Sequence, residues 1–124
     1  MRKIPKTSNK AKAELHKNQY KQWREKRLKQ GGYFIIFNDF KNNNILKELS
    51  GNALKLYIYL GLYSKNNTGE SWHSLQTMAE YFEKTERTIT NWLRELESLG
   101  LITRFQLEVD GVAYTFLKPY TSDK

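Results

Sequence analysis

Apolar residues recur with helical spacing in the second half of the chain. Four of them stand at i, i+3, i+4 and i+7, which predicts one apolar helix face about two turns long: Leu75, Met78, Ala79 and Phe82. Ser74 precedes this face as a good N-cap, Glu83-Lys84 predicts a turn, and Thr85 can cap a second helix. That helix continues to Gly100, a residue suited to the position just after a helix C-terminus. The pattern predicts two helices joined by a tight turn.

The second of these helices is predicted to have two chemically different sides. At about 100° per residue, its apolar side consists of Ile89, Trp92, Leu93, Leu96 and Leu99, and its opposite side centres on Arg87, Thr90, Asn91 and Arg94. Arginine can donate two hydrogen bonds to guanine, asparagine can pair bidentately with adenine, and threonine can bond a base or touch the thymine methyl group. The polar side is therefore suited to reading base edges. Arginines on an amphipathic helix can also serve solubility alone, and the segment after the helix favours the first interpretation.

Two strand-like runs follow the helix. They span residues 101–109 and 112–117 and are separated by Asp110-Gly111, a strong signal for a two-residue hairpin turn. Counting outward from this turn pairs Val109 with Val112, Leu107 with Tyr114 and Phe105 with Phe116. One face of the hairpin is then apolar, and the other face carries Arg104, Gln106, Glu108, Ala113 and Thr115.

Further elements are predicted upstream. Tyr33–Phe37 is a short apolar run that predicts a strand, and Ser71-Trp72 adds a few strand residues. Ser50 is a good N-cap for a helix that reaches about Ser64 and is apolar almost all round, as expected of a helix buried in the middle of a domain. Gly31-Gly32 marks the boundary between this domain and an N-terminal arm.

The charge of the 124-residue chain is concentrated in that arm. Residues 1–30 hold eleven Lys or Arg and two Glu, a net of +9, so residues 31–124 carry −1 of the total of +8. The arm has too few large apolar residues to fold alone, and good helix formers predict a solvated helix from Lys10 to Gln30, capped by Ser8 or Asn9. A mobile charged tail is the alternative. We expect the arm to bind phosphates, with these residues among its contacts: Lys21, Arg24 and Arg27.

The residue content gives little support to catalysis. Cysteine is absent, and His16 and His73 have no HxxxH or HxH spacing, so neither a disulfide nor a metal site is expected. The sequence has no Gly-rich phosphate loop and no pairing of acidic residues that suggests acid–base work, which predicts a non-enzymatic protein without a cofactor. No stretch reaches the roughly 18 apolar residues of a membrane span, and no signal peptide is recognised, so a cytoplasmic protein without membrane partners is expected.

Residues 33–120 resemble the winged helix-turn-helix superfamily. The resemblance is carried by LQTMAEYF and by TERTITNWLRELESLGLI, whose final step leads into the hairpin. Within this superfamily the chain is most similar to the DNA-binding domains of plasmid and phage replication initiators and related mobile-element proteins of Gram-positive bacteria. The resemblance implies a mainly α fold with a small β-hairpin wing, an α+β class, with an arm at 1–30, a winged helix-turn-helix domain at 31–120 and a tail at 121–124. Two departures are Glu83-Lys84, where Gly is frequent, and the acidic wing tip of Glu108 and Asp110.

The resemblance also implies sequence-specific binding of double-stranded DNA, with the second helix in the major groove. The expected contacts lie in the turn, the second helix and the base of the wing: Lys84, Thr85, Arg87, Thr88, Thr90, Asn91, Arg94 and Arg104. Two roles fit almost equally well: a transcription regulator, and an accessory in the replication or transfer of a plasmid, phage or conjugative element. The partners would be DNA, a second copy of the chain, and replication or transfer proteins. The alternative is a winged helix that binds a partner protein or single-stranded nucleic acid, with Tyr20 and Trp23 docking or stacking on bases.

Overall fold

The chain is divided into two units. The computed structural model describes residues 8–65, 67–109 and 111–121, and the division falls between Tyr33 and Phe34. Residues 1–7 of the expected arm, Asp110 of the expected turn and residues 122–124 of the expected tail lie outside the described residues.

In the described residues of the first unit there is a single helix, α1, which spans Asn9–Gln30. The side chain of Ser8 caps it by accepting a hydrogen bond from the Ala11 N–H. No residue of α1 is buried, because charged and polar side chains surround the helix and leave no continuous apolar stripe to pack against a neighbour. Neither α1 nor any other helix in the described part of the chain is long and apolar enough to cross a membrane.

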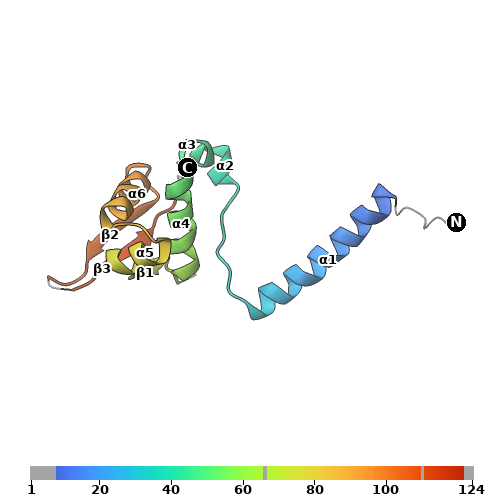
Figure 1. Ribbon diagram of the computed structural model, residues 1–124, viewed down its shortest axis with the longest axis horizontal. Coiled ribbons are helices and arrows are strands. Elements are labelled where there is room, and N and C mark those ends of the chain that lie inside the picture. Colours follow the sequence, from blue (N-terminus) through green and yellow to red (C-terminus); the bar gives the residue numbers. More distant parts are fainter. Residues whose placement is uncertain (1–7, 66, 110, 122–124) are drawn as a thin grey trace. The chain divides into compact units, whose positions relative to one another are not determined.

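The second unit contains five helices and three strands among its described residues. In chain order they are α2 (Asp39–Asn42), α3 (Ile45–Glu48), α4 (Gly51–Tyr63), β1 (Glu70–Ser71), α5 (Leu75–Phe82), α6 (Glu86–Ser98), β2 (Ile102–Gln106) and β3 (Ala113–Leu117). The strands form one antiparallel sheet in the order β1-β3-β2 (Figure 1). The predicted class, a mainly α fold with a small β-hairpin wing, is confirmed.

The predicted helix caps are also confirmed. The hydroxyl oxygens of Ser50, Ser74 and Thr85 each accept a hydrogen bond from the backbone N–H three residues later, at 3.0–3.2 Å. Gly100 follows α6 with φ +75°, a conformation in which a residue with a Cβ is strained. The N–H of Gly100 bonds the Glu97 carbonyl and the next N–H bonds the Leu96 carbonyl, both at 3.0 Å, so the end of α6 is closed as a Schellman motif.

The core lies where α4, α5, α6 and β2 meet. Its fully buried members come from each of these elements and include Leu56, Leu60, Met78, Ile89, Leu96 and Ile102. The expectation that α4 is buried all round is wrong, because Leu62 is 61% exposed and Tyr63 is 52% exposed. Only one side of α4 packs against α6 and the rest of the core, so apolar residues on its other side remain in contact with water.

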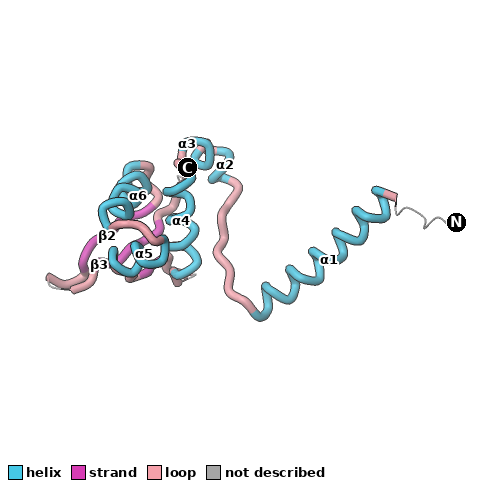
Figure 2. The backbone as a smooth tube through the Cα atoms, viewed as in Figure 1, coloured by secondary structure: helices cyan, strands magenta, loops and turns pink. Residues whose placement is uncertain are grey.

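The predicted strand at Tyr33–Phe37 is wrong, and residues 32–37 form a loop (Figure 2). A strand needs a neighbouring strand for its backbone hydrogen bonds, and here the Phe37 N–H instead donates to the Tyr120 hydroxyl at 2.8 Å. The short helices α2 and α3 follow, and they escaped prediction because each has only four residues. They are separated at Asn44, whose φ of 64° breaks the helix.

The predicted register of the hairpin is wrong by two residues. Phe105 lies opposite Tyr114 instead of Phe116, and the last pair before the loop joins Gln106 to Ala113. The loop is therefore longer than the expected two-residue turn, and a Gly111 N–H to Glu108 carbonyl bond of 3.0 Å lies within it. Because a shift of two residues keeps each side chain on its face, the predicted division into an apolar and a polar face remains correct.

Candidate nucleic-acid interface

Helices α5 and α6 are held together by a tight turn. Glu83 ends α5 in the left-handed conformation, with φ 56°, which explains why a position of this kind favours glycine. The N–H groups of Glu83 and Lys84 donate to the carbonyls of Glu80 and Ala79, and Thr85 then begins α6 as its N-cap. The chain thus turns within three residues, and α6 packs against α5.

One side of α6 faces the core and the other faces solvent. Ile89, Trp92, Leu93 and Leu96 are buried, and the residues at Arg87, Asn91 and Arg94 are exposed. These three side chains follow one another at intervals of four and three residues, so they form one row along the helix. No hydrogen bond or ion pair joins them to another side chain in the described part of the chain, which leaves their donors and acceptors available to a partner.

The acidic residues beside this row do not all face solvent in the same way. The Glu95 carboxylate accepts the Ser50 N–H at 2.7 Å and the Ser50 hydroxyl at 2.8 Å. It therefore sits at the N-terminus of α4, where the helix dipole favours a negative charge. This pair of bonds fixes α6 against α4 and directs the Glu95 charge away from the exposed row.

The predicted contact residues at the ends of this region differ in their availability. Lys84 is exposed, whereas the hydroxyls of Thr85 and Thr88 bond to each other at 3.1 Å within the cap. Thr90 is half-buried beside the row. Arg104, on β2, donates through Nη1 to the His73 carbonyl at 3.2 Å and to the Thr115 hydroxyl at 2.8 Å.

Arg104 is therefore engaged inside the domain. Burial lowers the pKa of its guanidinium group, and the nearby Glu97 carboxylate opposes this shift. The guanidinium group joins the loop before α5 to the inner face of the sheet. Arg104 is thereby separated from the exposed row on α6.

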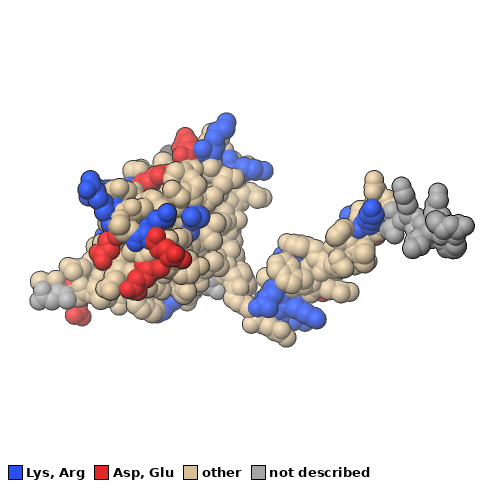
Figure 3. Space-filling view, in the orientation of Figure 1, with Lys and Arg blue, Asp and Glu red and all other residues tan. Residues whose placement is uncertain are grey.

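The predicted contacts in the arm are all exposed on α1: Lys21, Arg24 and Arg27. The Arg27 guanidinium folds back toward Gly31, where a Cβ would lie 2.1 Å from its Nη2 atom. On the face of the molecule in Figure 3, Lys and Arg side chains dominate the charges of α1, whereas both signs are mixed over the second unit. The uneven charge distribution of the sequence is thus retained on the surface.

Two further polar residues belong to this region and were missed from the sequence. Ser98 continues the spacing of the exposed row by four residues and is itself exposed, so helical periodicity could have identified it. Lys55, on α4, has its Nζ 5.9 Å from the ring centres of both Phe82 and Trp92. No sequence signal points to Lys55, because its position depends on how α4 packs against the other two helices.

This arrangement of fold and site defines a winged helix-turn-helix domain. Residues 47–102 match a protein-family model described as a helix-turn-helix domain. The match begins in α3 and ends at the first residue of β2, so it includes α4, α5 and α6 and covers a little under half of the chain. The comparison with curated proteins finds no match.

Among solved structures, the chain is similar to one described as a MarR-like transcriptional regulator from Thermotoga maritima. The two share 18% sequence identity with a TM-score of 0.49, and the similarity covers 82% of this chain. It covers 63% of the regulator, so the chain spans less than two thirds of that protein's length.

Proposed function

We propose that the second unit binds double-stranded DNA in a sequence-specific manner through the exposed row of α6. The observation that supports this most directly is that Arg87, Asn91 and Arg94 share one solvent-facing side of the second helix of a helix-turn-helix. Such helices enter the major groove, which admits an α-helix and presents a different donor and acceptor pattern for each base pair. Thr90, at the side of the row, is within the same group of candidate base contacts.

The basic helix α1 is proposed to supply affinity without sequence preference. Its Lys and Arg side chains are exposed, and the net charge of residues 1–30 is +9 against −1 for the rest of the chain. Contacts to phosphates release counterions, so their contribution decreases as salt increases. Specificity and affinity would then reside on different units of the protein.

We propose two biological roles, and the resemblance of the sequence to replication-initiator domains supports the second. The protein would act as a transcription regulator, or as an accessory in the replication or transfer of a plasmid, phage or conjugative element. The position of its binding site separates these roles, because a regulator binds at a promoter and an accessory binds at an origin of replication or transfer.

The test begins with selection of bound duplexes from a random pool, followed by fluorescence anisotropy on the selected duplex and on a scrambled one. We expect Asn91→Ala and Arg94→Ala each to reduce the preference for the selected duplex by about 1–3 kcal/mol. The matched control for the first variant is Asn52→Ala, because Asn52 is also exposed on a helix but lies on α4. Equal losses on both duplexes, or no enrichment in the selection, would contradict sequence-specific reading by α6.

The role of α1 is tested by the triple variant Lys21→Gln, Arg24→Gln and Arg27→Gln. If all three side chains contact phosphates, the slope of log K against log salt should become shallower by about 2.7. Both duplexes should be affected alike, because phosphate contacts carry no sequence information. An unchanged slope would show that α1 does not contact the DNA.

A second candidate function is binding of single-stranded nucleic acid. It is favoured by Tyr20 and Trp23 of α1, whose rings lie 5.6 Å apart and are 60% and 58% exposed. Exposed aromatic rings can stack on unpaired bases. Competition of the bound duplex with an unlabelled single strand distinguishes this function, and displacement by the single strand at equal concentration would favour it.

A further inference from the structure

The sheet of the second unit has an aromatic face that is turned away from the core. Phe105 and Phe116 stack with ring centres 5.0 Å apart, Tyr114 lies 6.2 Å from Phe116, and Trp72 lies 6.2 Å from Tyr114. Trp72 is 50% exposed and Phe105 is 49% exposed. The opposite face of the same strands contains the buried residues, so the more apolar face of this sheet is the one in contact with water.

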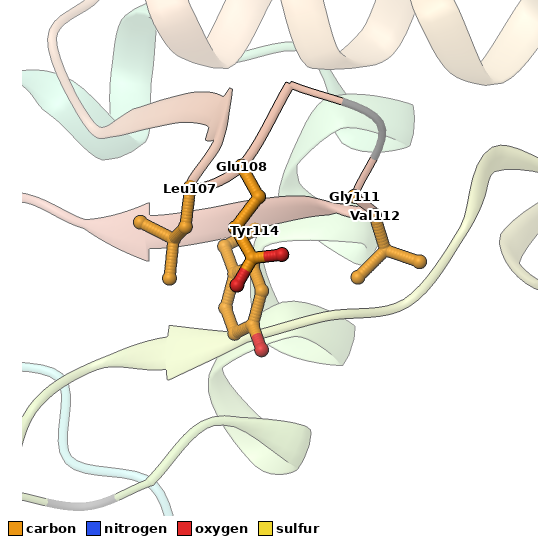
Figure 4. A pocket seen from close by; sticks show the side chains of 5 residues that line it. All are labelled: Leu107, Glu108, Gly111, Val112 and Tyr114. Atoms are coloured by element: carbon orange, nitrogen blue, oxygen red, sulfur yellow. The ribbon is translucent and has the colours of Figure 1, made fainter.

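This face continues onto the wing. Leu107 and Val112 are 58% and 59% exposed, and Figure 4 shows them on either side of Tyr114, around a hollow of about 190 Å³ that Glu108 and Gly111 also line. Together we call these six residues the outer sheet face: Trp72, Phe105, Leu107, Val112, Tyr114 and Phe116. Contiguous exposed apolar surface of this kind is typical of interaction sites.

Cross-strand aromatic pairs stabilise a hairpin on their own, but that role does not account for the whole outer sheet face. Leu107 and Val112 lie beyond the ends of β2 and β3, where they add no pair to the sheet. Half of the surface of Trp72 and of Phe105 likewise remains exposed, although the Lys65 amino group lies over the Trp72 ring. A partner that covers the face would remove all of this apolar surface from water.

The area of the face fits a protein interface of ordinary size. Trp72, Phe105, Leu107 and Val112 are about half exposed, whereas Tyr114 and Phe116 are more buried. The six residues together present on the order of 400–500 Å² of apolar surface. A stable interface of about 800 Å² per partner that is about 60% apolar needs about 480 Å². The outer sheet face therefore has the apolar area of one side of such an interface.

The charges around the face favour a second copy of the same chain. At the base of the sheet the Lys65 amino group lies 5.7 Å from the Trp72 ring centre and pairs with the Glu70 carboxylate at 3.7 Å. The basic charge of this end therefore comes from the exposed Lys118, which follows β3. At the other end Glu108 adjoins Leu107 in the hollow. A two-fold axis lying in the interface and perpendicular to the strands places the wing tip of each copy over the base of the other. The basic end of one copy then faces the acidic end of its partner, as an isologous contact requires.

Unpaired bases fit the face less well. The Phe116 ring is tilted by 24° from the Phe105 ring and by 20° from the Tyr114 ring. The Phe105 ring, with its centre 5.0 Å away, covers part of the Phe116 face, whereas bases stack on open ring faces. Glu108 would also repel phosphates. We propose that the outer sheet face is a homodimer interface in which two copies pack their sheets against each other. This inference does not depend on DNA binding by α6.

Sedimentation velocity on the 124-residue chain over a range of concentrations tests the proposal. We expect a reversible dimer, and we expect Val112→Glu and Leu107→Glu each to weaken dimerisation by about tenfold or more, because each places a charge in an apolar contact. The matched control is Leu62→Glu on α4, since Leu62 is 61% exposed against 59% for Val112. This control should leave the dimer unchanged, and circular dichroism should show the same helix content in all three variants.

Two sets of results would overturn the proposal. A wild-type protein that remains monomeric, or a dimer that is weakened by Leu62→Glu and not by Val112→Glu, shows that the outer sheet face is not the contact between copies. If the wild type is monomeric and Val112→Glu and Trp72→Ala weaken its binding to an oligothymidine probe, unpaired bases are the ligand of the face instead. None of these results decides the outcome of the anisotropy tests of α6.

Discussion

Gly61 of α4 lies directly against the ring of Phe34, which belongs to the loop at residues 32–37. A Cβ built at Gly61 would lie 2.2–2.4 Å from three carbons of the Phe34 ring, where ordinary contact begins at 3.4 Å. The same ring packs edge-on against Tyr57 with the ring centres 5.6 Å apart. A methyl group at position 61 therefore forces the Phe34 ring to withdraw by about 1 Å or to leave its site.

The magnitude follows from two opposing effects. Alanine in a helix interior stabilises by about 0.5–1 kcal/mol relative to glycine, and overpacking typically costs about 1–3 kcal/mol. We expect Gly61→Ala to lower the free energy of unfolding by about 0.5–2 kcal/mol in the wild-type background. In a Phe34→Ala background the clash is gone, so the same change should raise the free energy of unfolding by about 0.5–1 kcal/mol.

Urea titrations of the wild type, both single variants and the double variant give the coupling energy between the two sites. The structure predicts a coupling of about 1–3 kcal/mol and a change of sign for Gly61→Ala between the two backgrounds. Equal effects of Gly61→Ala in both backgrounds would refute the reasoning, because they would show that the Phe34 ring does not occupy the space above Gly61.

Two other predictions concern the contacts around α4 and the sheet. Glu95→Ala should lower the free energy of unfolding by about 1–2 kcal/mol, because its carboxylate accepts two hydrogen bonds from Ser50; a urea titration measures this, and Glu80→Ala, a change at an exposed glutamate on α5, should have a clearly smaller effect. Burial lowers the pKa of His73. As the pH falls, the His73 side chain is therefore protonated in the unfolded chain before it is protonated in the folded protein. The stability that is present above a pH of about 6.5 is then lost progressively. The melting temperature of the wild type should therefore fall more between about pH 7.5 and pH 5.5 than that of His73→Phe, and equal falls would contradict the assignment.

The helices were predictable because their signals are local. Ser50, Ser74 and Thr85 each cap a helix with a side chain that bonds a backbone N–H three residues away, and this interaction needs no information from the rest of the fold. The Leu-Gly step at the end of α6 is local in the same sense. The spacing of apolar residues on α5 and α6 added which side of each helix is buried, and the structure agrees for Ile89 and Leu96.

The segments that were predicted wrongly depend on distant residues. The Phe34 ring lies against Gly61, and the Phe37 N–H donates to the Tyr120 hydroxyl. Both partners lie far along the chain, and an apolar run alone cannot distinguish a strand from a loop that packs on a helix. The hairpin register depended on a turn that the chain does not use. The alternation of apolar and polar residues along the strands predicted the two faces of the hairpin correctly, but it did not predict which face is buried.

The buried face carries Ile102 of the core together with a polar set of residues. Ser71 and Thr115 are each 1% exposed, and Arg104 reaches across the same face to the His73 carbonyl. Ile102, the small hydroxyl side chains and the hydrogen-bonded guanidinium lie between the sheet and the helices. The large aromatic side chains are consequently on the outside, and a sequence rule that buries the more apolar face gives the opposite orientation.

The scarcity of basic residues in the wing bears on the proposed DNA binding. Between Ile102 and Leu117 the sequence has a single cation, Arg104, and its guanidinium donates to groups inside the domain. A wing of this kind has little to offer to phosphates, so we infer that the salt dependence of DNA binding comes from α1 and from residues around α6. If the wings instead join two copies, two α6 helices act together, and a two-fold axis in the protein predicts an inverted repeat in the selected DNA. If the selected DNA contains a single half-site, α6 binds DNA without a dimer formed through the outer sheet face. The proposal for α6 would then hold without the proposal for the dimer.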